Sequence, residues 1–392
     1  MINQKLHIWM NIPSFHQNDL FNELRVHCGE FEVIYAHAKD EDRINQGWNC
    51  EQKGHYKSKT IGKDLKFWQL LAYVFKNRKN THIVNGIWAE KSLFFAIILL
   101  NIFKVNFLIY SEAPIPTKYR SFSKKIVLKF IIKPLSKLLI MRAKGFLAVS
   151  IFAVEYFESL GVIADKIYRF GYFRNVANDN FPKYLGCGLN LWEVRQTYKK
   201  ASLIFVGQLI ERKGVINLLK AVKIIFESHK GFHLTIIGTG ELEPLLTNFI
   251  HENQLENTVN LLGVINSENI TNYIEKADLL ILPSVFDGWG MVINEALQSY
   301  VPVLVSDKCG AKELVNHEQN GFIFQHNSVQ SLSENLQKFL NLSHVERNRI
   351  RSFSGEIREK ISISIVSNYL ILCLKHCLKP QNIKPLAPWL NE

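Results

Sequence analysis

The sequence has few cysteines, and none of them is spaced for a metal site. Its six cysteines are scattered along the chain. Cys373 and Cys377 lie close together, but no second Cys or His pair is spaced to complete a zinc site with them. Reduced thiols of a cytoplasmic protein are therefore expected, and neither a metal nor another cofactor is predicted.

Long apolar runs are also missing. Met1–Met10 has no apolar signal core and no cleavage site, which argues against secretion. The longest apolar stretch, Ser92–Tyr110, is interrupted by Asn101 and Lys104, whereas a membrane-spanning helix needs about 20 predominantly apolar residues. This stretch predicts a helix followed by a strand rather than a transmembrane segment.

What the sequence does contain is enough apolar residues for a large core. Of its 392 residues, 47% are hydrophobic and 21% are charged, a balance that excludes long disorder. No repeat or low-complexity tract is present, which excludes solenoid and collagen-like architectures. The length is that of two or three average domains.

Short apolar, β-branched runs alternate with helical patterns in both halves of the chain. The expected strands are Leu6–Met10, Phe31–His37, His82–Ile87, Val105–Ser111, Gly145–Ser150, Ile167–Phe173, Ser202–Gly207, His233–Gly238, Val259–Val264, Asp278–Pro283, Pro302–Ser306 and Gly321–Phe324. Runs this short and this apolar are typical of strands buried on both faces of a parallel sheet. The sequence therefore predicts an α/β protein with two facing, Rossmann-like, doubly wound domains and a cleft between them.

The domain limits follow from a polar stretch in the middle of the chain. Phe181–Lys200 contains a proline and two glycines and precedes a new strand. We therefore expect one domain over residues 1–190 and a second over 199–342. Residues 343–392 are expected to form a helical segment that packs back toward the first domain.

Positive charge is concentrated in the first half. Residues 1–198 hold 28 Lys and Arg against 16 Asp and Glu, whereas residues 199–392 hold 19 of each. Residues 118–144 alone hold nine Lys or Arg and no acid, between Ile, Leu and Phe. The basic residues that recur every four positions are Lys125, Lys129, Lys133 and Lys137.

Such a basic amphipathic segment predicts contact with an anionic membrane surface. A solvated lysine face over the domain core is the alternative. Nucleic acid is not expected as a partner, because no RNA-binding motif accompanies the charge.

The most informative motif follows the strand that ends at Pro283. Asp287 precedes Gly288-Trp289-Gly290, and a helix that begins at about Met291 carries Glu295. Glycines let backbone N–H groups approach an anion, and a helix N-terminus favours a phosphate. Both carboxylates can reach the mouth of one cleft. The alternative is a tight turn in which Asp287 only caps the helix and Glu295 is solvated.

A second motif, Gly207–Gly214, joins a strand to a helix. Its adjacent cations Arg212 and Lys213 lie in the loop, at the carboxyl edge of the predicted sheet. Two cations at this place can neutralise a diphosphate, and the guanidinium offers bidentate geometry. Read alone, the motif is also compatible with a solvated basic loop.

These residues resemble the GT-B glycosyltransferases of the large retaining family 4. That family carries a Pro-Ser after a strand, an acidic residue, a Gly-aromatic-Gly and a Glu, and the matching residues here run from Pro283 to Glu295. Upstream, a strand-ending Gly and a Lys-Gly match Gly207, Lys213 and Gly214. The resemblance covers Ser202 to about Leu340 by motif and the first half only by architecture.

The resemblance implies roles for individual positions. Glu295 would contact the ribose of a sugar nucleotide, Asp287 the transferred sugar, and Lys213 the diphosphate. The backbone amides facing sugar and diphosphate would be those of Gly288, Trp289, Gly290, Met291 and Val292, with Gly207 and Gln208 also on the donor side.

Two positions depart from the family pattern. The first acid is usually Glu and is here Asp287, and the Arg usual after the strand-ending Gly is here Gln208. Arg212 is expected to supply the missing cation.

By the same resemblance, the first half would bind the acceptor. The candidates are His16, in a loop after the first strand that lacks the family's glycines, and Asn85, at a strand end where many relatives have His. Glu112 follows the next strand, well placed to accept a hydrogen bond from an acceptor hydroxyl.

The function that this resemblance implies is retaining transfer of a sugar from a nucleotide diphosphate to a lipid-linked or polysaccharide acceptor. It would occur at the inner face of the cytoplasmic membrane and require no metal. The alternative is a non-catalytic GT-B-like subunit that binds a sugar nucleotide or docks a partner.

Overall fold

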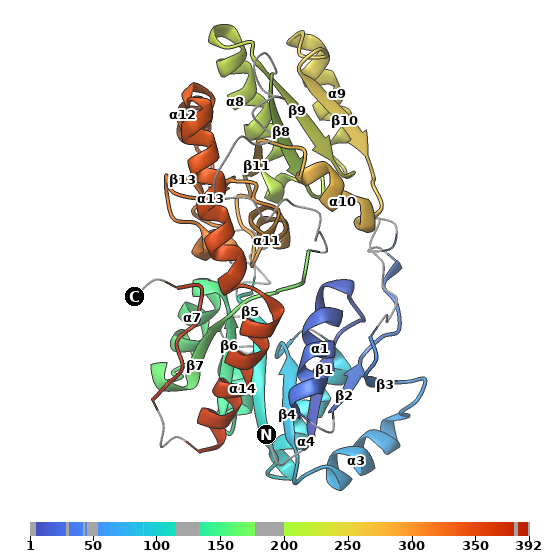
Figure 1. The fold of residues 1–392 in the computed structure, drawn as a ribbon. Helices are drawn as coiled ribbons and strands as arrows, with labels where there is room; N and C mark the ends of the chain where they lie inside the picture. The colour runs from blue at the N-terminus through green and yellow to red at the C-terminus, as the bar shows by residue number, and fades with distance from the viewer. Residues whose placement is uncertain are drawn as a thin grey trace. The chain divides into compact units, whose positions relative to one another are not determined.

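The computed structural model describes residues 5–28, 31–41, 44, 54–88, 90–114, 133–176, 200–379 and 383–390. The chain divides into two compact units. The first comprises Met1–Ile44, Asn49–Arg174 and Ser362–Glu392, and the second comprises Asn45–Trp48 and Asn175–Ile361. Each unit is a parallel sheet with helices packed on it (Figure 1).

The sheet of the first unit has seven strands in the order β3-β2-β1-β4-β5-β6-β7, and every neighbouring pair is parallel. The strands are β1 (Leu6–Met10), β2 (Phe31–Tyr35), β3 (Lys57–Thr60), β4 (Thr81–Asn85), β5 (Asn106–Glu112), β6 (Gly145–Val149) and β7 (Ile167–Phe170). All residues of β1, β2, β4 and β6 are buried, as expected for strands covered on both faces.

The helices of the first unit connect these strands and bury apolar residues against them. They are α1 (Phe15–Cys28), α3 (Phe67–Lys76), α4 (Lys91–Ile102), α6 (Lys133–Ile140), α7 (Ser150–Ser159) and α14 (Ile363–Leu378). The core beneath α3, α4 and α7 includes Val74, Leu100 and Phe157, each fully buried. Helix α14 returns from the end of the chain, and its His376 Nδ1 lies 2.6 Å from the Tyr168 hydroxyl of β7.

The second unit has a six-stranded parallel sheet in the order β10-β9-β8-β11-β12-β13. The strands are β8 (Ala201–Val206), β9 (Phe232–Ile237), β10 (Val259–Gly263), β11 (Leu279–Leu282), β12 (Val303–Ser306) and β13 (Gly321–Phe324). The helices are α8 (Val215–Ser228), α9 (Glu243–Glu252), α10 (Ser267–Ile274), α11 (Met291–Gln298), α12 (Val329–Asn341) and α13 (His344–Lys360). The predicted α/β fold with two doubly wound domains is confirmed.

The strand order reverses once in each sheet. In the first unit the reversal lies between β1 and β4, and in the second between β8 and β11. Doubly wound sheets bind ligands beyond the carboxyl ends of the strands at such a point. The loops that follow these four strands are therefore where the fold favours a binding site.

The helical segment expected over 343–392 contains two helices in the structure, α13 and α14. The helix breaks at 361–362, where α13 ends in the second unit and α14 begins in the first. The main passage from the first unit to the second falls at 174–175, ahead of the expected boundary at 181–200. Most of that boundary region lies outside the described residues.

Only part of the lysine segment 118–144 falls within the described residues. Lys133 and Lys137 are exposed on α6, whose first turn contains Pro134. Lys125 and Lys129 lie outside the part that the structure describes.

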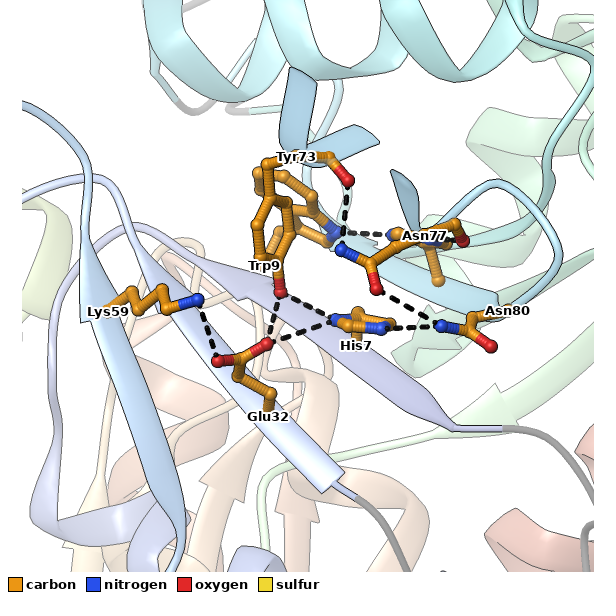
Figure 2. Close-up of polar contacts among 8 residues, drawn as sticks. His7, Trp9, Glu32, Lys59, Tyr73, Asn77 and Asn80 are labelled. Carbon is orange, nitrogen blue, oxygen red and sulfur yellow. Dashed lines mark hydrogen bonds and ion pairs between the residues drawn. The ribbon is translucent and has the colours of Figure 1, made fainter. Parts of the chain in front are cut away.

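A buried polar cluster ties α3 to the amino ends of three strands (Figure 2). His7 of β1 stands beside Glu32 of β2 and His82 of β4 in the sheet register. The Tyr73 hydroxyl of α3 lies 2.7 Å from His7 Nδ1 and donates to Glu32 Oε2. Lys59 Nζ approaches the other oxygen of Glu32 at 3.2 Å.

The two histidines of this cluster are held neutral. The Trp9 indole N–H donates to His82 Nδ1 at 3.0 Å, and Asn80 Nδ2 lies 3.1 Å from His7 Nε2. Burial lowers the pKa of His82 to about 4, and burial with the nearby positive groups lowers the pKa of His7 to about 2. A ring that keeps a fixed neutral tautomer gives the cluster one hydrogen-bond pattern.

No single helix among the described residues is long and apolar enough to cross a membrane. Helices α13 and α14 meet that test only when they are taken together as a bent pair, and buried core helices also meet it. The four cysteines in the described residues, Cys28, Cys309, Cys373 and Cys377, are buried free thiols.

Candidate active site

The predicted cations and the first predicted acid of the second unit meet at the point where its strand order reverses. Lys213, after β8, donates from Nζ to Asp287 Oδ2, after β11, at 2.5 Å. The side chains are 15% and 12% exposed. Since β8 and β11 are neighbours, residues 74 positions apart form one ion pair.

Arg212 lies at the same place. Its Nη1 donates to the Phe286 carbonyl at 3.0 Å and lies 3.8 Å from Asp287 Oδ1. The Arg212 carbonyl in turn accepts from the Val285 N–H at 2.8 Å. The guanidinium is thus held beside the Asp287 carboxylate, which Lys213 also contacts.

The charges around Asp287 decide its protonation state. Burial alone would raise the pKa of this carboxyl, but Lys213 and Arg212 outweigh burial, with further help from the hydrogen bond of Lys213 and the Trp289 N–H. The pKa of Asp287 is therefore lowered, and the site at neutral pH holds one buried carboxylate between two cations.

Backbone contacts with the loop after β12 fix the loop that carries Asp287. The Asp287 N–H donates to the Lys308 carbonyl at 3.0 Å, and the Gly310 N–H donates to the Asp287 carbonyl at 2.9 Å. The Cys309 thiol and the Ala311 N–H both donate hydrogen bonds to the Trp289 carbonyl, at 2.9 and 2.7 Å. The acid therefore lies on a rigid support, which an enzyme needs to position a charge.

Two glycines allow the backbone segments around Asp287 to pack closely against each other. Gly214 has φ +69°, and a Cβ there would lie 2.0 Å from the Pro283 carbonyl oxygen. Gly290 has φ +94°, and a Cβ there would lie 2.7 Å from Cys309 Sγ. Each position combines a left-handed backbone with a close approach, so only glycine fits.

Replacing Gly290 by Ala is expected to lower the thermal stability of the second unit by about 2 kcal/mol. The new methyl group meets Cys309 and Leu282 in addition to the strained φ. Gly263→Ala is the matched control, because Gly263 has φ +67° with no atom within 4 Å of its added Cβ. Equal losses of thermal midpoint in both variants would show that the packing against Cys309 does not matter.

Helix α11 begins at Met291, as the sequence predicts, and its first N–H groups lie at the Asp287 end of the site. Glu295 is buried on this helix, and Val292 and Met291 are partly buried. The Trp289 side chain is buried as well, and its indole N–H donates to Asn294 Oδ1 at 2.9 Å. The Trp289 side chain therefore belongs to the packing of α11, and its backbone holds the loop that carries Asp287.

The remaining donor-side candidates lie close by. Gly207 follows β8, and Gln208 is partly buried beside it. Gly288 is buried between Asp287 and Trp289. Ser284 of the Pro-Ser motif lies here too, with its hydroxyl 3.4 Å from Asp287 Oδ2. Sequence reasoning assigned no role to Cys309, because a lone cysteine does not by itself signal a ligand site.

The acceptor-side candidates belong to the first unit. His16 and Asn85 follow or end the two strands at its strand reversal, and Glu112 ends the next strand, β5. Asn85 is the last residue of β4 and is buried. His16 does not lie in a loop as expected, because α1 begins at Phe15 and places it in the first helical turn. Glu112 ends β5 and is exposed. These positions lie at the carboxyl ends of β4 and β5 and after β1.

No group of three or more His, Cys, Asp or Glu is arranged to hold a metal within the described ranges. The ion pairs that the structure describes at the site join Asp287 to Lys213 and Arg212. Two cations with a helix N-terminus can bind a diphosphate directly.

A parallel α/β sheet with a cationic loop, an acid and a helix N-terminus at its strand reversal is an arrangement that favours binding of an anionic ligand at that point. Residues 192–354 match the family model described as Glycosyl transferases group 1. The match to this family thus falls almost entirely in the second unit, and each of the two parallel sheets has the doubly wound topology of the GT-B fold.

Two curated relatives align with parts of the chain. An uncharacterized glycosyltransferase of Methanocaldococcus jannaschii is 30% identical over 138 residues, which are 33% of this chain and 35% of the relative. The amylovoran biosynthesis glycosyltransferase AmsK of Erwinia amylovora is 31% identical over 137 residues, 33% of this chain and 34% of its own. The matches thus span about a third of the length of these relatives.

One solved structure is similar over nearly the whole chain. HepE of Anabaena, crystallised in complex with UDP, superposes with a TM-score of 0.72 at 15% identity. The match covers 95% of this chain and 99% of HepE. At this level of sequence identity, the similarity shows that the two proteins share a fold and nothing further.

Proposed function

We propose that this protein is a retaining glycosyltransferase that moves a sugar from a nucleoside-diphosphate sugar to a lipid-linked or polysaccharide acceptor. The observation that carries the proposal is the Asp287–Lys213–Arg212 cluster beside the N-terminus of α11. It lies inside the segment that matches the group 1 family. The UDP in the HepE crystals supports a nucleotide as ligand of this fold.

The proposed chemistry is mainly electrostatic. Negative charge builds on the diphosphate as its bond to the sugar breaks, and Lys213, Arg212 and the helix N-terminus stabilise that charge. The site is rigid and partly buried, so little reorganisation is needed during the reaction. The acceptor hydroxyl attacks from the leaving-group face, and the departing phosphate oxygen accepts its proton.

The ion pair prepares the cations for this task. Without donor, Asp287 balances Lys213 and Arg212, which keeps both cations in place. A bound diphosphate then competes with Asp287 for the two cations, and the carboxylate becomes available to the transferred sugar. No metal is required in this account.

The acceptor side and the cellular location belong to the same proposal. His16, Asn85 and Glu112 of the first unit are the acceptor-binding candidates, and Glu112 would accept a hydrogen bond from the acceptor hydroxyl. The positive charge of the first half supports activity at an anionic membrane surface. The proposed surface is the inner face of the cytoplasmic membrane. The role of AmsK in amylovoran biosynthesis supports a glycan product.

A non-catalytic subunit that binds a sugar nucleotide is the second candidate. Gln208 and Asp287, the two departures from the family pattern, favour it. Arg212 weakens this alternative, because its guanidinium lies 3.8 Å from Asp287 Oδ1 and can replace the cation missing at position 208.

Glu295→Ala is expected to weaken nucleotide binding and turnover by at least about tenfold, or about 1.4 kcal/mol. The reason is the proposed contact of this carboxylate with the donor ribose. Titration calorimetry with UDP and GDP measures the binding. Glu334→Ala, on exposed helix surface of the same unit, is the control. Wild-type affinity in the Glu295 variant would remove this residue from the site.

A further inference from the structure

Helix α3 of the first unit presents an apolar stripe to solvent. Trp68, Leu71 and Phe75 are 79%, 43% and 48% exposed. Their spacing of three and four residues places them on one face of the helix. The opposite face is buried, with Leu70 and Val74 in the hydrophobic core.

The stripe continues onto the end of α4. The Phe75 ring lies 5.3 Å from the ring of Phe103, and the preceding residue Ile102 is 62% exposed. The Arg78 guanidinium stacks over Phe75 at 4.1 Å. Apolar and cationic groups thus lie in one continuous surface, which we call the α3 surface and define as residues 63–79 with Ile102 and Phe103.

Positive charge surrounds the stripe. Residues 57–80 hold six Lys and one Arg against a single acid, Asp64. The exposed basic side chains are Lys57, Lys63, Lys66, Lys76, Arg78 and Lys79. The Asp64 carboxylate accepts from the Thr60 N–H at 2.7 Å.

The helix is held so that this stripe faces outward. Tyr73, on the buried face, is fixed by His7 and Glu32 in the polar cluster (Figure 2). At the start of the helix, the Lys66 N–H donates to Gln69 Oε1 at 2.8 Å. Rotation of α3 to bury Trp68 would break the Tyr73 contacts and leave polar groups unsatisfied inside the sheet.

We propose that the α3 surface docks into the headgroup region of an anionic lipid membrane. Trp and Phe side chains prefer the membrane–water interface, and Lys and Arg are attracted to anionic headgroups. A surface for a protein partner would not favour this composition, because lysine is depleted in protein interfaces. The proposal goes beyond sugar transfer, concerns residues outside 118–144 and does not depend on catalysis.

The test is flotation of the full chain with vesicles of phosphatidylcholine, with and without phosphatidylglycerol. Wild type is expected to bind the anionic vesicles at low salt and to be released by salt. Trp68→Ser with Phe75→Ser should weaken the partition coefficient at least about tenfold. Val345→Ser is the matched control, because Val345 of α13 is also 79% exposed.

A second variant pair guards against indirect effects. Trp68→Phe keeps the apolar contact, so it should bind as wild type but lose much of the tryptophan quenching by brominated lipid. The Lys125→Gln, Lys129→Gln variant measures how much the other basic segment, residues 118–144, contributes to vesicle binding.

Three results would overturn the proposal. They are no wild-type binding at low salt, equal binding by the Trp68→Ser, Phe75→Ser variant, and a lipid-free dimer that this variant dissociates in sedimentation velocity. The last result would assign the surface to a second copy of the chain. UDP binding in the same samples tests the donor site separately, so failure of one proposal leaves the other measurable.

Discussion

Replacing Lys213 by Met is expected to lower the turnover number at least about a hundredfold and to destabilise the second unit by about 3 kcal/mol. The first effect reflects loss of the charge that stabilises the leaving diphosphate. The second reflects the Asp287 carboxylate, which lies 2.5 Å from Lys213 Nζ in a largely buried site. Nucleoside diphosphate release and thermal unfolding measure the two effects.

A double variant separates structure from chemistry. Lys213→Met with Asp287→Asn removes both charges, so stability should recover while turnover stays low. Lys338→Met breaks an exposed pair with Glu318 in the same unit, whose side chains are 58% and 57% exposed, and should change stability by less than about 1 kcal/mol. Wild-type turnover in the Lys213 variant would contradict the role of this cation.

The first unit is expected to lose stability steeply as the pH falls below about 6.5, by on the order of 1 kcal/mol per pH unit for each buried histidine. Burial lowers the pKa of His82 to about 4, and burial with nearby positive charge lowers the pKa of His7 to about 2. Below the unfolded value of about 6.5, only the unfolded chain binds these protons, so acid favours unfolding. Denaturation midpoints at about pH 7 and pH 5 measure the effect.

Matched histidine variants test whether the buried histidines cause the loss of stability at low pH. His82→Gln should reduce the pH dependence of the midpoint, because one of the two buried titrating groups is removed. His251→Gln, at a side chain that is 85% exposed, should leave it unchanged. The same pH dependence in wild type and the His82 variant would mean that other groups drive acid unfolding.

The sequence predicted most strands because they are buried and apolar. Each of the twelve expected strands overlaps one in the structure, with ends shifted by a few residues at most. Strand β3 was missed because it lies at the edge of the sheet and reads Lys-Ser-Lys-Thr, with no apolar alternation. An edge strand of this kind lacks a fully buried face, so its sequence shows no alternation of apolar and polar residues that would predict a strand.

The ion pair between Lys213 and Asp287 could not be predicted from the sequence pattern. Lys213 and Asp287 were each predicted, but their contact depends on β8 and β11 being neighbours, and strand order is not encoded in local periodicity. The Trp289 indole was also unpredictable, because its hydrogen bond to Asn294 turns it into the core. His16 was misplaced because the start of α1 has no acidic residue in its first turn to mark it.

The most direct test of the account is sugar transfer by the purified chain. The protein is incubated with a panel of nucleoside-diphosphate sugars and glycolipid acceptors, and product mass, released nucleotide and anomeric configuration are measured. The account predicts a product that retains the donor configuration, with release lost in Lys213→Met and Asp287→Asn. Tight nucleotide binding without turnover of any donor would contradict it and would identify the protein as a binding subunit.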